Sequence, residues 1–334
     1  MSVLISASDL RALGLAVLGA AGTPAFAASA VVDALLAAEL EGISSHGFSR
    51  LPAYADQARS GKVKAGAEVR LTVQAPSVLM VDAGNGFAFP AIAKGIEAAM
   101  VRAREQGLCA LGVRRSHHCG VLGFFMEKIA AGGLIGLACT NSPAAMAPWG
   151  GKKAVFGTNP LAFGCPRARG EALIIDLSLS KAARGKVMLA GQRGESIPAD
   201  WALDAEGRET TDPQAALRGT MLPLGGAKGA ALALMVEILA ATLTGSNHAS
   251  EASSFFDATG PAPGVGQFFL LIDPGPFNPD FLSRLEALCA EILEQGNTRL
   301  PGDRRRAERE KRLRAGISLP EDLLTDLRTR AGEY

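Results

Sequence analysis

Apolar and polar positions follow two different periods along the chain, and these periods predict helices and strands in turn. Apolar residues spaced three and four positions apart predict helices over about 6–21, 24–41, 49–60, 90–106 and 229–243. Short, mainly aliphatic runs predict strands at 71–73, 78–81, 108–113, 134–139, 173–175 and 267–272. Because the two kinds of element alternate, the predicted fold class is α/β.

Two other regions are less regular. Residues 184–217 are rich in Gly, Pro, Asp and Thr, so we expect an irregular excursion there, and the charged C-terminal third is expected to be helical. Residues 12–32 carry no charge, which also fits a secretory signal. We prefer two buried helices, because Asp9 lies where a signal needs positive charge and Thr23-Pro24 is typical of a helix cap.

The composition is that of a globular protein. The 334 residues are 48% hydrophobic, with a mean hydropathy of +0.18. A net charge of +1 provides no long-range field for a polyanion, so neither nucleic acid nor a membrane is an expected partner. The five cysteines are widely spaced and form no C-x-x-C pair, which favours reduced thiols in the cytoplasm and no metal site.

The usual nucleotide-binding signatures are absent. A G-x-G-x-x-G motif between a strand and a helix lets the backbone approach a pyrophosphate. Here Gly84-Asn85-Gly86 has Phe89 at the third glycine position, and Gly264-Val265-Gly266 precedes a strand. No glycine-rich loop ends in Gly-Lys-Ser or Gly-Lys-Thr. These observations argue against both standard nucleotide folds.

Three of the four histidines lie in the turns Ser45-His46-Gly47 and Ser116-His117-His118-Cys119-Gly120. A histidine in a turn can exchange a proton with a ligand near pH 7, although each serine could equally cap a helix beside an exposed histidine. Arg50 follows His46 by four residues, so both can face one side, and a guanidinium binds a carboxylate in bidentate fashion. A surface ion pair is the alternative for Arg50. Together, His46 and Arg50 predict a pocket for a 2-oxo or 2-imino acid.

Six motifs in fixed order resemble the type-2 malate/L-lactate dehydrogenase family. They are Ser44-Ser45-His46-Gly47, Ser116-His117-His118-Cys119-Gly120, Thr140-Asn141-Ser142-Pro143, Phe156-Gly157-Thr158-Asn159-Pro160, Asp176-Leu177-Ser178-Leu179-Ser180 and Gly225-Gly226-Ala227-Lys228-Gly229. The similarity covers nearly the whole chain. It implies a non-Rossmann NAD(P)-binding fold with helical N- and C-terminal segments, which accounts for the missing glycine motif.

On this basis we expect three domains. Residues 1–70 with 295–334 would form a helical segment that carries Ser45, His46 and Arg50. Residues 71–118 with 265–294 would form an α/β domain, and residues 119–264 would form the NAD(P)-binding domain. The resemblance also implies a homodimer.

The resemblance implies hydride transfer between NAD(P)H and a small 2-oxo acid, or a cyclic 2-imino acid in the piperideine/pyrroline-2-carboxylate reductase branch. In the imine branch, His46 with Ser45 would donate the proton and Arg50 would hold the substrate carboxylate. In the ureidoglycolate dehydrogenase branch the acid/base histidine lies in the second turn, where His118 matches. Both histidines stay candidates. The residues implied near the substrate are Thr158, Arg184 and Gly185.

Cofactor contacts are implied for several loops and a late segment. The residues are His118, Cys119, Gly120, Val121, Leu122, Ser142, Asp176, Leu177, Ser178, Lys228, Arg304, Arg305 and Arg306. The three arginines suit a 2′-phosphate, which favours NADPH, with NADH as the alternative. A solvated charged helix is the other interpretation of this arginine run.

One residue departs from the imine branch, which is expected to have Asp after Arg184-Gly185 where this chain has Lys186. An ammonium group there would lower the pKa of a nearby histidine. The preferred function is still reduction of pyrroline-2-carboxylate or piperideine-2-carboxylate to the L-amino acid. The alternative is a dehydrogenase of a 2-hydroxy acid such as malate, lactate, ureidoglycolate or sulfolactate. A binding protein without turnover is a third hypothesis, against which the intact His46, Arg50 and His118 argue.

Overall fold

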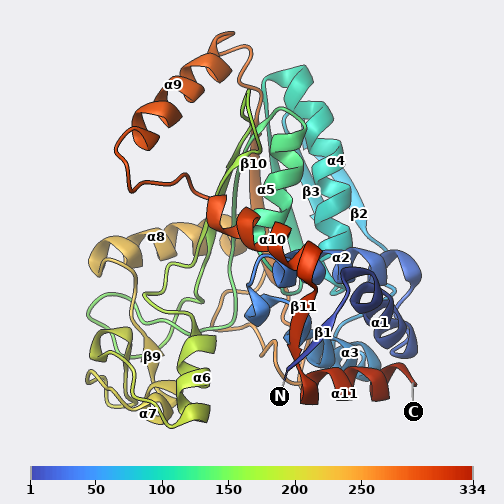
Figure 1. Cartoon of the computed structure of the whole chain (residues 1–334), viewed down its shortest axis with the longest axis vertical. Coiled ribbons are helices and arrows are strands. Elements are labelled where there is room, and N and C mark those ends of the chain that lie inside the picture. Colours follow the sequence, from blue (N-terminus) through green and yellow to red (C-terminus); the bar gives the residue numbers. More distant parts are fainter. Residues whose placement is uncertain (1, 333–334) are drawn as a thin grey trace.

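A mixed seven-stranded sheet runs through the middle of the computed structural model, which describes residues 2–332 (Figure 1). In spatial order its strands are β2 (Arg70–Ala75), β3 (Val78–Asp82), β4 (Leu108–Ser116), β10 (Val265–Ile272), β5 (Ile135–Thr140), β6 (Leu161–Cys165) and β7 (Leu173–Leu177). β3 and β4 are parallel, and β10, from late in the chain, is antiparallel to both β4 and β5. The α/β class is confirmed, and every predicted strand lies in this sheet.

Helices from the first third of the chain form the main core with the sheet. α1 (Ala7–Ala20), α2 (Ala25–Leu40) and α3 (Leu51–Ser60) precede α4 (Ala88–Gln106) and α5 (Leu122–Ala131), which pack directly on the sheet. α2 contacts both α1 and α4 and buries most of its length, which explains why its sequence is nearly free of charge. The two long opening helices are therefore confirmed.

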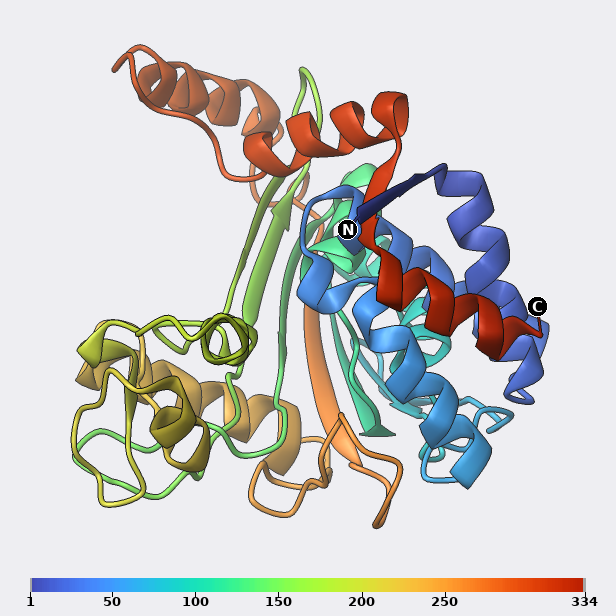
Figure 2. The same ribbon diagram turned by 60° about the horizontal axis from the view of Figure 1, so that its bottom comes forward.

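The two ends of the chain lie side by side (Figures 1 and 2). β1 (Ser2–Ile5) pairs with β11 (Ile317–Pro320) in antiparallel fashion, and α11 (Glu321–Ala331) packs on α1. Neither strand is predicted from the sequence, because each has only four residues. The division into three domains remains a prediction, and the central sheet is continuous across two of the proposed domains.

A second core lies beside the sheet, at the lower left of Figure 2. It is built from α6 (Arg184–Arg193), the 3-10 turn Ala199–Trp201, β8 (Ala202–Leu203), α7 (Pro213–Arg218), β9 (Thr220–Met221), α8 (Ala227–Glu237) and the π-helical turn Ile238–Thr242. The expectation of an irregular excursion over 184–217 is therefore wrong. Its turn residues delimit short helices: Gly194 ends α6 at φ 66°, and the Asp212 side chain caps α7.

Two smaller expectations also need correction. β6 is not predicted from the sequence, although it forms five residues of the sheet. Thr23 does not cap α2: Pro24 occupies the capping position, and the buried Thr23 hydroxyl has no hydrogen-bond partner among the described residues. The helix begins here because the fixed φ of proline suits a helix start.

The late part of the chain is largely helical, as predicted. α9 (Phe281–Leu293) projects from the end of the sheet, and α10 (Asp303–Ala315) crosses back toward the N-terminal helices (Figure 1). All five cysteines are free and buried. None of the helices within residues 2–332 combines the length and the apolar character that a bilayer crossing requires.

Candidate active site

The strand register gathers the predicted site loops at one edge of the sheet. β4 and β5 both pair with β10 in antiparallel fashion, so they run in the same direction and end at the same edge. β6 begins and β7 ends at that edge, where Leu161 pairs with Leu177. Four segments therefore lie close together at this edge. They are 117–122 after β4, 141–143 after β5, 157–160 before β6 and 176–178 at the end of β7.

The His46 turn reaches this edge from the helical part of the chain. Two 3-10 turns, Ser44–His46 and Phe48–Arg50, lead from α2 into α3. The Ser45 hydroxyl lies 3.0 Å from Nδ1 of His46, and Nε of Arg50 donates a hydrogen bond of 2.7 Å to the carbonyl of Ser45. The three residues singled out from the sequence are thus brought together.

His118 arrives at the same place from the end of β4. Its ring centroid lies 5.4 Å from that of His46, so the two rival histidines face one site. The hydroxyl of Tyr54, a fully buried residue of α3, is hydrogen-bonded to Nδ1 of His118. Tyr54 is not predicted from the sequence as a site residue, although its position four residues after Arg50 is a signal that could have found it.

Burial and neighbouring cations keep both histidines neutral. Burial, followed by the charges of Arg50 and Arg305, lowers the pKa of His46 to about 4. Burial, followed by Arg50, lowers the pKa of His118 well below its ordinary value. Burial also raises the pKa of the Tyr54 phenol. Near pH 7 the site therefore holds two neutral imidazoles, which are bases, beside a neutral phenol.

Arg50 is a largely desolvated cation without an anionic partner. Burial lowers the pKa of its guanidinium, and its side chain stacks over the ring of Phe256 at 4.4 Å. Within residues 2–332 it makes no ion pair with a carboxylate. Because a desolvated charge is costly until it is paired, this guanidinium is suited to bind an anionic ligand.

An aromatic segment closes the site, and the sequence contains no signal for it. The Phe255 ring packs 5.1 Å from that of His118, and Phe256 lies on Arg50. The segment is tethered by the buried Lys62, whose Nζ donates to the carbonyls of Ser254 at 2.8 Å and Asp257 at 3.0 Å. These two contacts join residues that are 192 and 195 positions apart in the sequence.

His117 is held away from ligand chemistry by a buried glutamine. The Gln57 amide donates to the carbonyl of Phe255 at 2.8 Å, so its oxygen faces Nε2 of His117, also at 2.8 Å. That geometry places the imidazole proton on Nε2. Burial, followed by Lys62 and Arg50, lowers the pKa of His117 to about 3. His117 is thus a neutral packing residue, which agrees with the sequence-based preference for His118.

The start of α6 lies against the His46 turn. A β-carbon placed on Gly185 would be 3.7 Å from Cβ of Ser45. The exposed Lys186 follows directly, at the position of the departure noted in the sequence. Arg184, in contrast, donates to the carbonyl of Leu217 at 3.1 Å, so its guanidinium is directed into the second core. The structure brings Gly185 to the His46 turn but not the Arg184 guanidinium.

Ser142 and Thr158 meet at the edge of the sheet. The backbone N–H of Thr158 donates to the Ser142 hydroxyl at 3.2 Å, and its carbonyl accepts from Leu179 at 2.9 Å. The buried carboxylate of Glu237 fastens these loops by accepting from the side chains of Asn141 and Asn159, at 3.2 and 2.9 Å. Lys228 is exposed in the first turn of α8, next to a segment in which Leu224 N–H donates to the Leu179 carbonyl.

Asp176 connects the His118 loop with the late arginines. Its carboxylate accepts from the N–H of Gly123, in the first turn of α5, at 2.8 Å, and lies 3.5 Å from the guanidinium of Arg305. The loop from His118 to Leu122, including Cys119, Gly120 and Val121, leads directly into this turn. Leu177 and Ser178 continue from Asp176, and the Ser178 hydroxyl is bonded to that of Ser180 at 2.7 Å.

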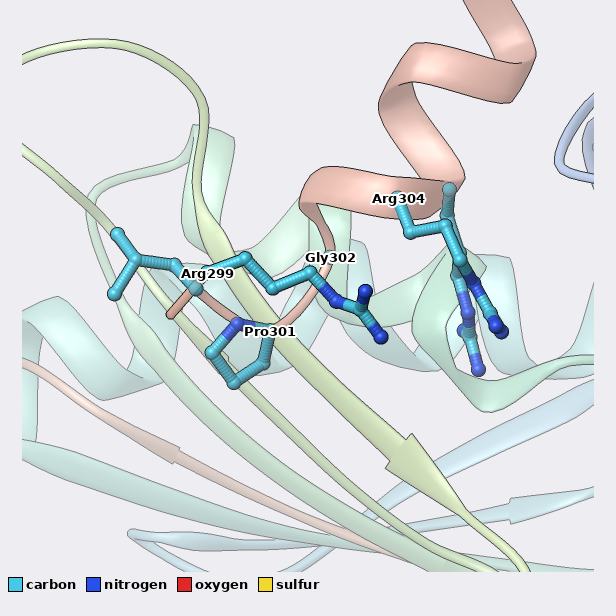
Figure 3. A pocket seen from close by; sticks show the side chains of 6 residues that line it. Arg299, Pro301, Gly302 and Arg304 are labelled. Carbon is cyan, nitrogen blue, oxygen red and sulfur yellow. The ribbon is translucent and has the colours of Figure 1, made fainter. Parts of the chain in front are cut away.

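The late arginines divide into different roles. Arg305 is engaged by Asp176, and Arg306 by the carbonyl of Ala172 and the carboxylate of Asp303. Arg304 makes no ion pair with any residue in the 2–332 range. It lines a surface pocket together with Arg299, whose guanidinium points toward that of Arg304 across Pro301 and Gly302 (Figure 3). Arg299 was not identified from the sequence.

Comparison with known proteins agrees with this geometry. The sequence pattern of the family described as malate/L-lactate dehydrogenase matches residues 5–328. A (2R)-3-sulfolactate dehydrogenase (NADP(+)) from Chromohalobacter salexigens is 53% identical over 331 residues, which cover 99% of each chain. A Δ1-pyrroline-2-carboxylate/Δ1-piperideine-2-carboxylate reductase from Pseudomonas aeruginosa is 41% identical over 89% of this chain and 90% of its own.

Solved structures give the same result. The Δ1-piperideine-2-carboxylate reductase from Pseudomonas syringae superposes with a TM-score of 0.93 at 36% identity, over 98% of this chain and 99% of its own. The sulfolactate dehydrogenase from Methanocaldococcus jannaschii superposes with a TM-score of 0.91 at 28% identity, over 99% and 97%. The resemblance seen in the six sequence motifs is confirmed, and the chain belongs to the malate/L-lactate dehydrogenase family.

Proposed function

We propose that this oxidoreductase is an NADP-dependent dehydrogenase of a 2-hydroxy acid with a second anionic group, and that 3-sulfolactate is the first substrate to test. The observation that carries the proposal is the excess of positive charge at the site. Arg50 has no carboxylate partner within residues 2–332, and Lys186 follows the glycine that lies against Ser45. A carboxylate and a sulfonate together would match two cations, whereas a cyclic imino acid offers one anion.

The neutral histidines support the oxidative direction. The hydroxyl of the substrate gives its proton to an imidazole, while the hydrogen on C2 leaves as a hydride. NADP+ supplies the hydride acceptor when it is bound. In the tautomer that this role requires, the Nδ1–H of His46 donates to the Ser45 hydroxyl, which leaves Nε2 unprotonated to receive the proton, and Arg50 holds the carboxylate. His118 is the rival base, in the tautomer whose Nδ1–H donates to the Tyr54 hydroxyl and whose Nε2 is unprotonated.

The pocket beside Arg299 and Arg304 fits the 2′-phosphate of an NADP cofactor. Arg299 and Arg304 face one another without carboxylate partners in the described chain, so their pocket suits the 2′-phosphate. The loops 118–122 and 176–178, with Ser142 and Lys228, would bind the rest of the cofactor. Thr158 and Gly185 would border the substrate. The proposal is supported by the NADP(+)-dependent relative at 53% identity.

Imine reduction is the second candidate. The reductases from the two Pseudomonas species are similar to this chain over most of its length. The hydrogen bond between Ser45 and His46 also suits a proton donor to the imine nitrogen, while the imine carbon receives the hydride. Lys186 weighs against this function, because it stands where the imine reductases are expected to have Asp, and Arg50 and Arg305 already disfavour the protonated form of His46.

The deciding experiment compares substrates in both directions. NADP+ reduction is measured with both enantiomers of 3-sulfolactate and with malate and lactate. NADPH oxidation is measured with pyrroline-2-carboxylate, piperideine-2-carboxylate, pyruvate and oxaloacetate. We expect the highest kcat/KM with a sulfolactate enantiomer. Turnover of only the cyclic imines would replace the proposal by the second candidate, and no turnover with any substrate would favour a binding protein.

A homodimer is the proposed assembly. The turn from α8 into the π-helical segment exposes Leu234, Ile238 and Leu243 by 49%, 49% and 59%. Exposed apolar side chains in a contiguous segment are typical of a covered surface. Light scattering should give twice the 34.5 kDa mass of one chain, and a monomer at micromolar concentration would contradict the proposal.

A further inference from the structure

Glu39, at the end of α2, is a fully buried carboxylate inside the His46 turn. The Ser44 hydroxyl donates to its Oε1 at 2.5 Å, and the N–H of Phe48 donates to its Oε2 at 2.9 Å. Arg312 of α10 lies 3.8 Å from Oε1 and donates to the Glu39 carbonyl at 2.7 Å. A buried carboxylate is costly without such donors, so their arrangement fixes the turn strongly.

The two donors to the carboxylate stand on either side of Ser45, His46 and Gly47. Each carboxylate oxygen therefore holds one end of the segment that carries the proposed base. Gly47 packs directly on the carboxylate, because a β-carbon there would lie 2.0 Å from Oε2. No side chain larger than hydrogen fits at Gly47 while Glu39 keeps its place.

We propose that Glu39 is a positioning residue that sets the place of His46 through the backbone of residues 44–48. This inference rests on the proposed role of His46 as the base. Glu39 forms no hydrogen bond with the side chain of Ser45 or His46, so it acts only through Ser44 and Phe48. Arg312 also ties the turn to α10, the helix that carries Arg304 and Arg305.

The test is Glu39→Gln in the full-length enzyme, with Asp33→Asn as the matched control. Glutamine keeps the size of the side chain, but one of its two oxygens becomes an NH2 group, so either Ser44 or Phe48 loses its acceptor. Asp33 lies on the same helix and pairs with Arg11 at 2.7 Å, away from the turn. Active sites are counted by NADPH fluorescence titration, so that any unfolded fraction does not enter kcat.

We expect Glu39→Gln to lower kcat per active site by about 10-fold or more, with an unchanged KM for NADP+, and Asp33→Asn to behave as wild type. The acid limb of the kcat profile should also move to higher pH, because a displaced His46 becomes more hydrated while Arg50 and Arg305 stay in place. Wild-type kcat per site with an unshifted pH profile would overturn the inference. A smaller number of active sites with wild-type kcat per site would also overturn it.

Ser44→Ala is the second variant, in case Glu39→Gln does not fold. It removes one hydrogen bond to the carboxylate and should cause a smaller loss of kcat with the same direction of pH shift. A wild-type profile in Ser44→Ala would contradict the inference. His46→Ala distinguishes a failure of the proposed base from a failure of the Glu39 proposal. Full activity in His46→Ala refutes the proposed base. An inactive His46→Ala beside a normal Glu39→Gln refutes only the role of Glu39.

Discussion

The phenol of Tyr54 is hydrogen-bonded to Nδ1 of His118, deep in the site where α3 meets the end of β4. The bond leaves Nε2 as the nitrogen of His118 that can face a ligand. Because Tyr54 is fully buried and its phenol is kept neutral, the orientation of the His118 ring is set by the helix that also presents Arg50. Two elements distant in sequence thus share one rigid arrangement.

Tyr54→Phe should raise KM for the cofactor by roughly 10-fold, because an oriented ring becomes free to turn and a buried nitrogen loses its partner. Steady-state kinetics check the loss of affinity. The same change in a His118→Ala background should have no further effect on this KM, because the hydrogen bond is already absent. An equal loss in both backgrounds would mean that Tyr54 acts independently of His118.

His46→Ala should lower kcat for hydroxy-acid oxidation by about 10²-fold or more, the usual contribution of a general base. His118→Ala should affect KM for the cofactor more than kcat, because His118 begins the loop that leads into α5. Both variants are compared under saturating substrate and cofactor. The opposite pattern would assign the base to His118.

Lys186→Asp should change the substrate preference. The substitution removes the cation beside the His46 turn and restores the acidic residue expected in imine reductases, so a substrate with two anions should lose affinity. We expect a KM for sulfolactate about 10-fold higher and better turnover of piperideine-2-carboxylate. Arg193→Asp, at the other end of α6, makes the same charge change and serves as the control. An unchanged ratio of the two kcat/KM values would show that Lys186 does not face the substrate.

Arg304→Ala should raise KM for NADP+ by about 10-fold and leave KM for NAD+ unchanged, because only NADP+ carries a 2′-phosphate. Arg314→Ala is the matched control. Arg314 lies at the other end of the same helix, and its side chain is 77% exposed. Cofactor titrations with both dinucleotides measure the effect. A loss of affinity for both cofactors alike would place Arg304 elsewhere on the dinucleotide.

The low pKa of His46 predicts a loss of stability in mild acid. The imidazole has a pKa of about 4 in the folded chain against 6.5 in an unfolded one, so the unfolded chain binds more protons between these values. The free energy of unfolding should therefore fall as the pH drops from about 6.5 to about 4 and should be unaffected above that range. Urea unfolding at several pH values measures the slope.

His46→Gln should flatten this slope, because it removes the group whose pKa is lowered by burial. Part of the slope should persist in His46→Gln, since His117 and His118 are also held neutral by burial. Identical slopes in wild type and His46→Gln would show that His46 is hydrated in the folded protein.

The sequence by itself determined the class of fold and predicted the chemistry of the site. The alternation of periods identified six of the seven strands of the central sheet, all but β6, and the spacing of His46 and Arg50 predicted a proton-transfer group beside an anion-binding group. These features are local, because they depend on residues within one or two helical turns or one strand. Turn residues over 184–217 gave a wrong prediction, because Asp212 and Gly194 delimit helices there instead of interrupting regular structure.

Only the tertiary structure decided which residues complete the site and which charges are free. Phe255 reaches His118, and Gln57 bonds to the Phe255 carbonyl across 198 residues of sequence. Arg304 and Arg305 both line the pocket beside Arg299, but Arg305 is paired with Asp176 whereas Arg304 has no carboxylate partner among residues 2–332. In the sequence, Arg304, Arg305 and Arg306 form one uniform cationic segment. Which of these guanidinium groups is paired depends on partners that folding brings from distant parts of the chain.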